Sequence, residues 1–120
     1  MKIKTRKKPR IFKVNVGNTK IQLNDMAKIT LKENEQVTFK CLNSEYDVAK
    51  KDWGYYATPS INGRLKKFGF RTFLIKNKRD KLYIFLVFKN RLRSFKKYCK
   101  DDNQKILMEL TNGIKKVFLN

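Results

Sequence analysis

The chain of 120 residues is long enough for one domain and leaves little for a second, and its 41% hydrophobic content with nine phenylalanines can supply one core. Thirty lysines and arginines against ten acidic residues give a net charge of +20. Histidine is absent, which excludes an imidazole base, a Ser-His or Cys-His pair and histidine metal ligands.

The first ten residues are predicted to form a flexible basic arm, residues 1–10, ahead of a single α+β domain over residues 11–120. The arm holds six basic residues and no acid, shows no hydrophobic periodicity and contains Pro9. No apolar run approaches the ~20 residues of a membrane helix, and no hydrophobic segment follows the basic start as in a signal peptide. We therefore expect no transmembrane segment and a cytoplasmic protein.

Two short hairpins are predicted in the next thirty residues. Residues 11–16 alternate in polarity, and Gly17-Asn18 is typical of a tight turn into a second strand over residues 19–23. Residues 27–31 and 36–41 read as a second strand pair, and residues 42–57 are expected to be irregular.

A short helix is predicted over residues 59–68. Thr58 can cap it, Pro59 suits its first position, and Gly69 suits the left-handed residue after the last turn. Gly63 inside the segment costs about 1 kcal/mol relative to alanine, so the helix is expected to be short or broken.

The second half of the chain contains the clearest strand signals. Residues 70–77 and 81–88 predict a central hairpin, residues 70–88, and the strand over 81–88 is apolar on both faces, which is typical of a central strand covered on both sides. A helix is expected over residues 91–100. Residues 106–110 and 114–119 predict a closing hairpin. The fold class is therefore α+β: a single small domain with a mostly antiparallel sheet and two short helices.

The positive charge is clustered along the chain. Residues 1–20 carry +8, residues 21–60 carry −1, residues 61–100 carry +13 and residues 101–120 are neutral. An AT-rich genome would raise lysine everywhere, but it would not produce a near-neutral block beside one of +13. Clustered like charge destabilises a compact state and is relieved by an anionic partner.

One candidate site lies at the start of the helix predicted over residues 59–68. Unpaired backbone N–H groups at a helix N-terminus suit a phosphate, and nearby hydroxyls and bases would complete an anion cradle. The residues assigned to this site are Thr58, Ser60, Asn62, Arg64, Lys66, Lys67 and Arg71. The competing interpretation is that Thr58 only caps the helix and that the bases are solvated.

A second candidate is a surface for a nucleic-acid backbone. It combines one face of the helix at 91–100 with the hairpin tip and contains Lys76, Lys78, Arg79, Lys81, Arg93, Lys96, Lys97 and Lys100. A stripe of flexible cations without acids fits a line of phosphates, whereas an ordinary solvated face would mix both signs. Trp53, Tyr55 and Tyr56 could stack on unpaired bases.

Catalytic groups are scarce. Glu45, Asp47 and Asp52 could form a carboxylate cluster, but nothing pairs them with a nucleophile, so an enzyme is not expected. No metal or cofactor is predicted. Cys41 and Cys99 lack CxxC spacing and are expected to be structural thiols in a reducing compartment.

Three classes of function fit these patterns. The favoured one is a polyanion-binding module with nucleic acid, RNA above all, as its partner. The second is a protein that binds a small anionic ligand, such as a phosphosugar or nucleotide, or an enzyme accessory. The third is a protein-interaction domain whose charge reflects composition alone. The oligomeric state is left open.

Overall fold

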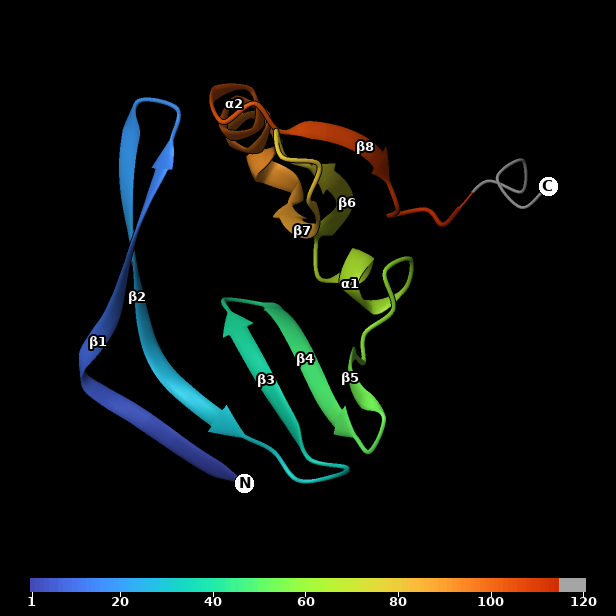
Figure 1. Cartoon of the computed structure of the whole chain (residues 1–120). Helices are drawn as coiled ribbons and strands as arrows, with labels where there is room; N and C mark the ends of the chain where they lie inside the picture. The colour runs from blue at the N-terminus through green and yellow to red at the C-terminus, as the bar shows by residue number, and fades with distance from the viewer. Residues whose placement is uncertain (115–120) are drawn as a thin grey trace.

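The computed structural model describes residues 1–114, which begin with a long two-stranded ribbon (Figure 1). β1 (Lys2–Val16) and β2 (Thr19–Thr30) pair antiparallel along their length. Gly17 and Asn18 form the turn, as the sequence predicts, and Gly17 has a φ of +58°. The positive φ suits glycine because it has no Cβ to clash with the backbone.

Residues 1–10, expected as a flexible arm, instead lie largely in β1. Ile3 is opposite Ile29 and Thr5 is opposite Ala27, so the alternation of basic and uncharged residues at the N-terminus is that of a strand. The pairing register shifts between Thr5 and Arg10. Pro9 lies in this interruption, where its missing N–H removes no ladder hydrogen bond.

The second sheet corrects the prediction for residues 27–57. β3 (Gln36–Cys41), β4 (Ser44–Lys51) and β5 (Gly54–Ala57) form an antiparallel sheet in that order. Residues 27–30 stay in β2 and do not pair with β3, and residues 42–57 are mostly strand. The pattern was obscured because β4 buries Asp47, a charged residue at 3% exposure, on its inner face.

The first helix, α1 (Arg64–Lys67), is four residues long and begins later than the predicted residue 59. No side chain caps it, and residues 61–63 form a turn ahead of it. Leu65 anchors it to the core at 1% exposure. Gly69 has a φ of +90°, which confirms its predicted left-handed conformation after the last turn.

The third sheet confirms the predicted hairpin at residues 70–88. β6 (Phe70–Lys76) pairs with β7 (Leu82–Phe88) on one side and with β8 (Lys105–Glu109) on the other. Within residues 1–114 the strand order β7-β6-β8 makes β6 central and places β7 at the edge, in contrast to the prediction of a central strand over residues 81–88. η1 (Lys89–Arg91) leads into α2 (Leu92–Asp101), which matches the predicted second helix.

The hydrophobic core lies between the third sheet and α2. Phe73, Ile75 and Val87 from the sheet pack against Phe95 and Cys99 of the helix. Burial of the Cys99 thiol raises its pKa. Cys41, in contrast to its expected role as a structural residue, is exposed at the end of β3, and both cysteines are free.

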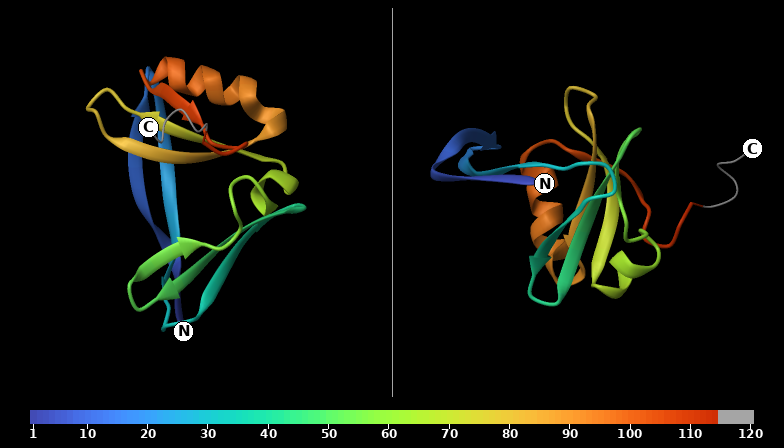
Figure 2. Two further views of the ribbon diagram at one scale, coloured as in Figure 1. Left: turned by 90° about the vertical axis from the view of Figure 1, so that its right-hand side faces the viewer. Right: turned by 90° about the horizontal axis from the view of Figure 1, so that it is seen from below.

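The fold is a single small α+β domain built from three small antiparallel sheets and two short helices (Figure 2). The Cα radius of gyration is 16.4 Å, compared with roughly 14 Å expected for a compact chain of this length. The ribbon runs along one side of the molecule from the second sheet to α2 (Figures 1 and 2). Across residues 1–114, no helix is both long enough and apolar enough to cross a membrane.

The described residues cover only part of the predicted C-terminal hairpin. Residues 106–110 were predicted as one strand of a closing hairpin, and β8 covers most of that range. Its partner is β6. The predicted partner, residues 114–119, lies beyond the described residues except for Ile114.

The turn of the ribbon lies directly against the end of α2. A Cβ on Gly17 would sit 2.6 Å from the backbone oxygen of Asp101. We expect Gly17→Ala to lower the free energy of unfolding by about 1 kcal/mol, because alanine is disfavoured at positive φ and meets this oxygen. Urea denaturation measures the loss.

Gly17→Asn separates the two causes, because asparagine tolerates positive φ but still carries a Cβ. If both variants are as stable as the wild type, the ribbon does not lie against α2.

Candidate functional site

Arginines and lysines have different surroundings in this structure. Four of the seven arginines form ion pairs: Arg6 and Arg10 with Asp25, Arg64 with Asp47, and Arg71 with Glu109. Among the lysines of residues 1–114, only Lys76 and Lys97 pair with a carboxylate, each with the acid four residues later. Most of the lysine charge is therefore not compensated by neighbouring side chains.

α2 presents its predicted basic face to solvent. Phe95 and Cys99 are buried and Leu92 is half-buried, whereas the four cations predicted for backbone contact are exposed. These cations are Arg93, Lys96, Lys97 and Lys100. Lys97 Nζ lies 2.7 Å from Asp101 Oδ2, so this one charge is shared with an acid at the end of the helix.

The tip between β6 and β7 is a fixed turn that carries exposed bases. Asn77 Oδ1 accepts hydrogen bonds from the backbone N–H groups of Arg79 and Lys81, both at 2.9 Å. Asp80 adopts a φ of +61° and lies 3.3 Å from Lys76 Nζ. Lys78 contributes to the lining of a hollow of about 520 Å³ with Asp101 and Asn103 from the end of α2. The structure therefore brings the turn and the C-terminal end of α2 together.

The anion cradle predicted around Thr58 and Ser60 is not formed as expected. α1 is too short to present a helix N-terminus there, and Thr58 Oγ1 donates to Gln36 Oε1 at 3.2 Å. Arg64 Nη2 donates to Asp47 Oδ2 at 3.0 Å and to Thr58 Oγ1 at 3.2 Å. These side chains satisfy one another, while Ser60, Asn62 and Lys67 are exposed around α1.

The remaining residues of that prediction line a separate hollow. Lys66 and Arg71 surround a volume of about 320 Å³ together with Lys89, which the sequence analysis did not select. Glu109 lines the same hollow and binds Arg71 through both oxygens, with 2.7 Å between Arg71 Nε and Glu109 Oε2. Because the guanidinium is occupied by this carboxylate, the hollow offers a small anion less charge than the sequence suggests.

The ion pair of Arg71 and Glu109 makes folding stability dependent on pH. The hydrogen bond from Arg71 lowers the pKa of Glu109 below its ordinary value of 4.5 and raises that of Arg71. A depressed carboxyl pKa stabilises the fold above the ordinary value, and this contribution is lost as the pH falls through the folded-state pKa.

We expect Glu109→Gln to flatten the loss of stability below about pH 4.5. Urea denaturation between pH 3 and pH 7 measures this change. Glu33→Gln, on the exposed turn before β3, removes the same charge and should retain the wild-type profile. Identical profiles for all three proteins would contradict a stabilising role for the pair.

The three aromatic residues predicted to stack on bases are exposed on the second sheet. Trp53 is 68%, Tyr55 63% and Tyr56 46% exposed. The rings of Trp53 and Tyr56 stack with centroids 5.8 Å apart, and Lys50 Nζ lies 5.7 Å from the centre of the Tyr55 ring. Figures 1 and 2 place this sheet at the opposite end of the molecule from α2, so the aromatic and basic groups do not share one surface.

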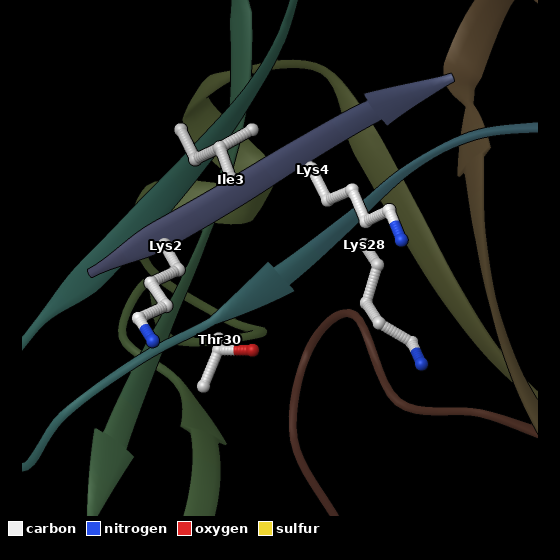
Figure 3. Close-up of a pocket in the computed structure, with 5 residues that line it drawn as sticks. All are labelled: Lys2, Ile3, Lys4, Lys28 and Thr30. Carbon is white, nitrogen blue, oxygen red and sulfur yellow. The ribbon is translucent and has the colours of Figure 1, made fainter.

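The ribbon carries a basic hollow that the sequence analysis did not identify as a site. Lys2, Lys4, Lys28 and Thr30 extend to the same side of the ribbon and Ile3 points to the other (Figure 3), around a volume of about 470 Å³. Lys4 lies directly opposite Lys28. Like charges in this arrangement destabilise a strand pair, and an anion would relieve them. Period-two alternation at the N-terminus is the signal that could have revealed this face.

The possible carboxylate cluster is not assembled as a catalytic site. Asp47 is buried and accepts a hydrogen bond from Thr38 Oγ1 at 2.6 Å in addition to the one from Arg64. Through these two hydrogen bonds, Asp47 of β4 connects β3 with α1. Over residues 1–114, no group of three or more histidine, cysteine or acidic side chains is arranged to hold a metal ion.

Comparisons with protein-family models, with curated proteins and with solved structures found no match to this chain.

Proposed function

We propose that this protein binds nucleic acid, with RNA favoured, through the exposed basic surface of α2 and the β6–β7 turn. The observation that carries the proposal is the charge of residues 61–100, +13 with Asp80 as the one acid, combined with the lack of carboxylate partners for most of its lysines. A polyanion would neutralise this surface, of which the acids within residues 1–114 pair only with Lys76 and Lys97 among the lysines.

The different surroundings of arginine and lysine side chains support contact with a phosphate backbone. Arg64 and Arg71 are committed to carboxylates inside the fold, whereas the lysines of α2 extend into solvent. A flexible ammonium group meets a regular line of phosphates without precise geometry. Such contacts give affinity and register but little base selectivity.

The aromatic residues favour unpaired RNA over a duplex. Trp53, Tyr55 and Tyr56 offer exposed rings beside Lys50 and Lys51, and bases stack on such rings when they are not paired. In an A-form duplex the base faces are hidden and the major groove is too narrow for side chains to read. A flexible single strand could contact rings and lysines at separate places on the molecule.

Neutralising the α2 face tests the proposal. A variant with Arg93, Lys96, Lys97 and Lys100 changed to glutamine should bind a fluorescein-labelled 20-nucleotide RNA on the order of tenfold more weakly in fluorescence anisotropy at 0.1 M salt. The matched control changes Lys13, Lys20, Lys32 and Lys40 to glutamine, which removes the same charge from other faces. Equal losses in the two variants would contradict a defined surface and favour a charge that is compositional.

A small anionic ligand remains the second candidate because Lys66, Arg71 and Lys89 line one hollow. Its support is weaker, since Glu109 already binds Arg71 there. Isothermal titration with inorganic phosphate and with a nucleoside monophosphate distinguishes the two. Tight binding of either molecule, lost in Lys89→Gln but kept in the α2 variant, would favour the small ligand.

A further inference from the structure

β7 has the sequence of a central strand but the position of an edge strand. Its side chains are apolar on both faces, yet among residues 1–114 it pairs with β6 alone. Leu82 is 60%, Ile84 53% and Tyr83 47% exposed as a result. A strand that is apolar on both faces is normally covered on both faces, with a strand on each side.

The backbone of β7 also has unused hydrogen-bonding groups. The N–H of Asn77 donates to the carbonyl of Lys81, and the N–H of Lys89 donates to the carbonyl of Gly69, both at 2.9 Å. Antiparallel pairs alternate between bonded and non-bonded, so the odd-numbered residues of β7 turn their backbone groups to β6. The even-numbered residues Leu82, Ile84 and Leu86 turn theirs outward, and no strand within residues 1–114 meets them.

A shallow apolar groove, widely open to solvent, lies beside this free edge between β7 and α2. It has a volume of about 370 Å³, and its lining includes Phe85, Val87, Arg91, Ser94, Phe95 and Tyr98. The ring of Phe85 lies 5.8 Å from that of Phe95 and 6.1 Å from that of Tyr98, centre to centre. A strand added to β7 would direct every second side chain into this groove and the others over the exposed Leu82 and Ile84.

The positive charge around the groove favours an acidic partner. Lys81 and Lys89 border β7, Arg91 lines the groove, and none of the ion pairs within residues 1–114 includes any of the three. A second copy pairing antiparallel through β7 would place Lys81 opposite Lys89 at both ends and bring together two chains of +20 each. Like charges directly opposite destabilise strand pairing, so a second copy is disfavoured.

We propose that β7 accepts an extended apolar segment of a partner protein as an added strand, with a large side chain of that segment in the groove and flanking acidic residues at Arg91 and the bordering lysines. Addition of a strand satisfies the outward backbone groups, and the pocket supplies specificity. The site shares Lys81 with the proposed nucleic-acid surface, but none of that surface's α2 cations, Arg93, Lys96, Lys97 and Lys100, lines the groove.

Binding of a set of synthetic peptides tests the proposal. Nine-residue peptides with valine and phenylalanine at alternate positions are flanked by glutamate, by serine or by lysine, and binding of the full chain is measured by fluorescence anisotropy. The glutamate-flanked peptides should bind at least about tenfold more tightly than the lysine-flanked ones. Arg91→Gln should reduce this preference severalfold. Lys96→Gln removes the same charge from the side of α2 that is near Glu109 of β8, and it should leave this preference unchanged.

Backbone changes test strand addition itself. N-methylation of the peptide at positions facing β7 should abolish binding, and N-methylation at the alternate positions should leave it unchanged. Ile84→Pro removes an outward N–H without removing a bond to β6, so it should abolish peptide binding while the chain stays folded. Ile84→Val keeps this N–H and should bind the peptide as the wild type does.

The proposal is wrong if no glutamate-flanked peptide binds, if the flanks make no difference, or if N-methylation has equal effects at both sets of positions. It is also wrong if RNA displaces the peptide and the β7 variants weaken RNA binding. Sedimentation that shows a dimer lost in Ile84→Pro would overturn it in favour of a second copy.

Discussion

Raising NaCl from 50 to 200 mM is expected to weaken binding of a single-stranded RNA by about 100-fold. The lysines of α2 and the β6–β7 turn are exposed, so each phosphate they contact releases a condensed counterion. With roughly five contacts, the plot of log affinity against log salt has a slope of about −3.5 for a single strand. Fluorescence anisotropy with a labelled 20-nucleotide RNA across this range of salt measures the slope.

The variant Arg93→Gln, Lys96→Gln and Lys97→Gln should flatten the slope to about −1.4, because three of five contacts are lost. Its circular dichroism spectrum and thermal midpoint should match the wild type, since these side chains lie off the buried stripe of α2. Tight binding that is insensitive to salt would show that phosphate contacts do not carry the affinity.

Local chemistry made several elements predictable. Gly17-Asn18 marks the ribbon turn, Gly69 takes its left-handed conformation, and the hairpin at 70–88 and the helix at 91–100 lie where their periodicity places them. Each signal depends on residues near one another in sequence. The exposed positions of the α2 cations follow in the same way from the buried stripe of Phe95 and Cys99.

Long-range pairing was not predictable in this way. Alternation shows that residues 27–30 and 36–41 are strands, but not that the first pairs with β1 and the second with β4. The apolar pattern of β7 predicts a central strand. Such a pattern indicates that both faces of a strand are covered, but it does not indicate which strands of the chain pair with it. The N-terminal residues read as an arm because their exposed ribbon buries little, so no hydrophobic stripe marks it.

The geometry expected around Thr58 and Ser60 differs from the observed one for a related reason. A helix cap, a hydroxyl and an arginine in one segment indicate a phosphate site only if their polar groups remain free. Asp47 lies 17 residues before Arg64 and belongs to the segment predicted to be irregular, yet it occupies the guanidinium. No pattern within residues 58–71 reports that contact.

Arg64→Gln is expected to lower the free energy of unfolding by about 2 kcal/mol. Asp47 has a side chain only 4% exposed, and Arg64 is its ion-pair partner at 3.0 Å. Without the guanidinium, a buried carboxylate keeps the hydrogen bond from Thr38 but loses its counter-charge, and such losses cost about 3–5 kcal/mol for a fully buried pair. We expect less here because the Arg64 side chain is 50% exposed and water can partly replace it.

A double-mutant cycle by urea denaturation separates this structural role from ligand binding. Asp47→Asn removes the buried charge, so adding Arg64→Gln to Asp47→Asn should cost much less than Arg64→Gln alone, with a coupling energy of about 1 kcal/mol or more. Lys67→Gln, on the same short helix and exposed, should leave stability unchanged within about 0.5 kcal/mol. If Arg64→Gln were as stable as the wild type but bound inorganic phosphate more weakly, Arg64 would be a ligand of an anion and the pair with Asp47 would contribute little to the fold.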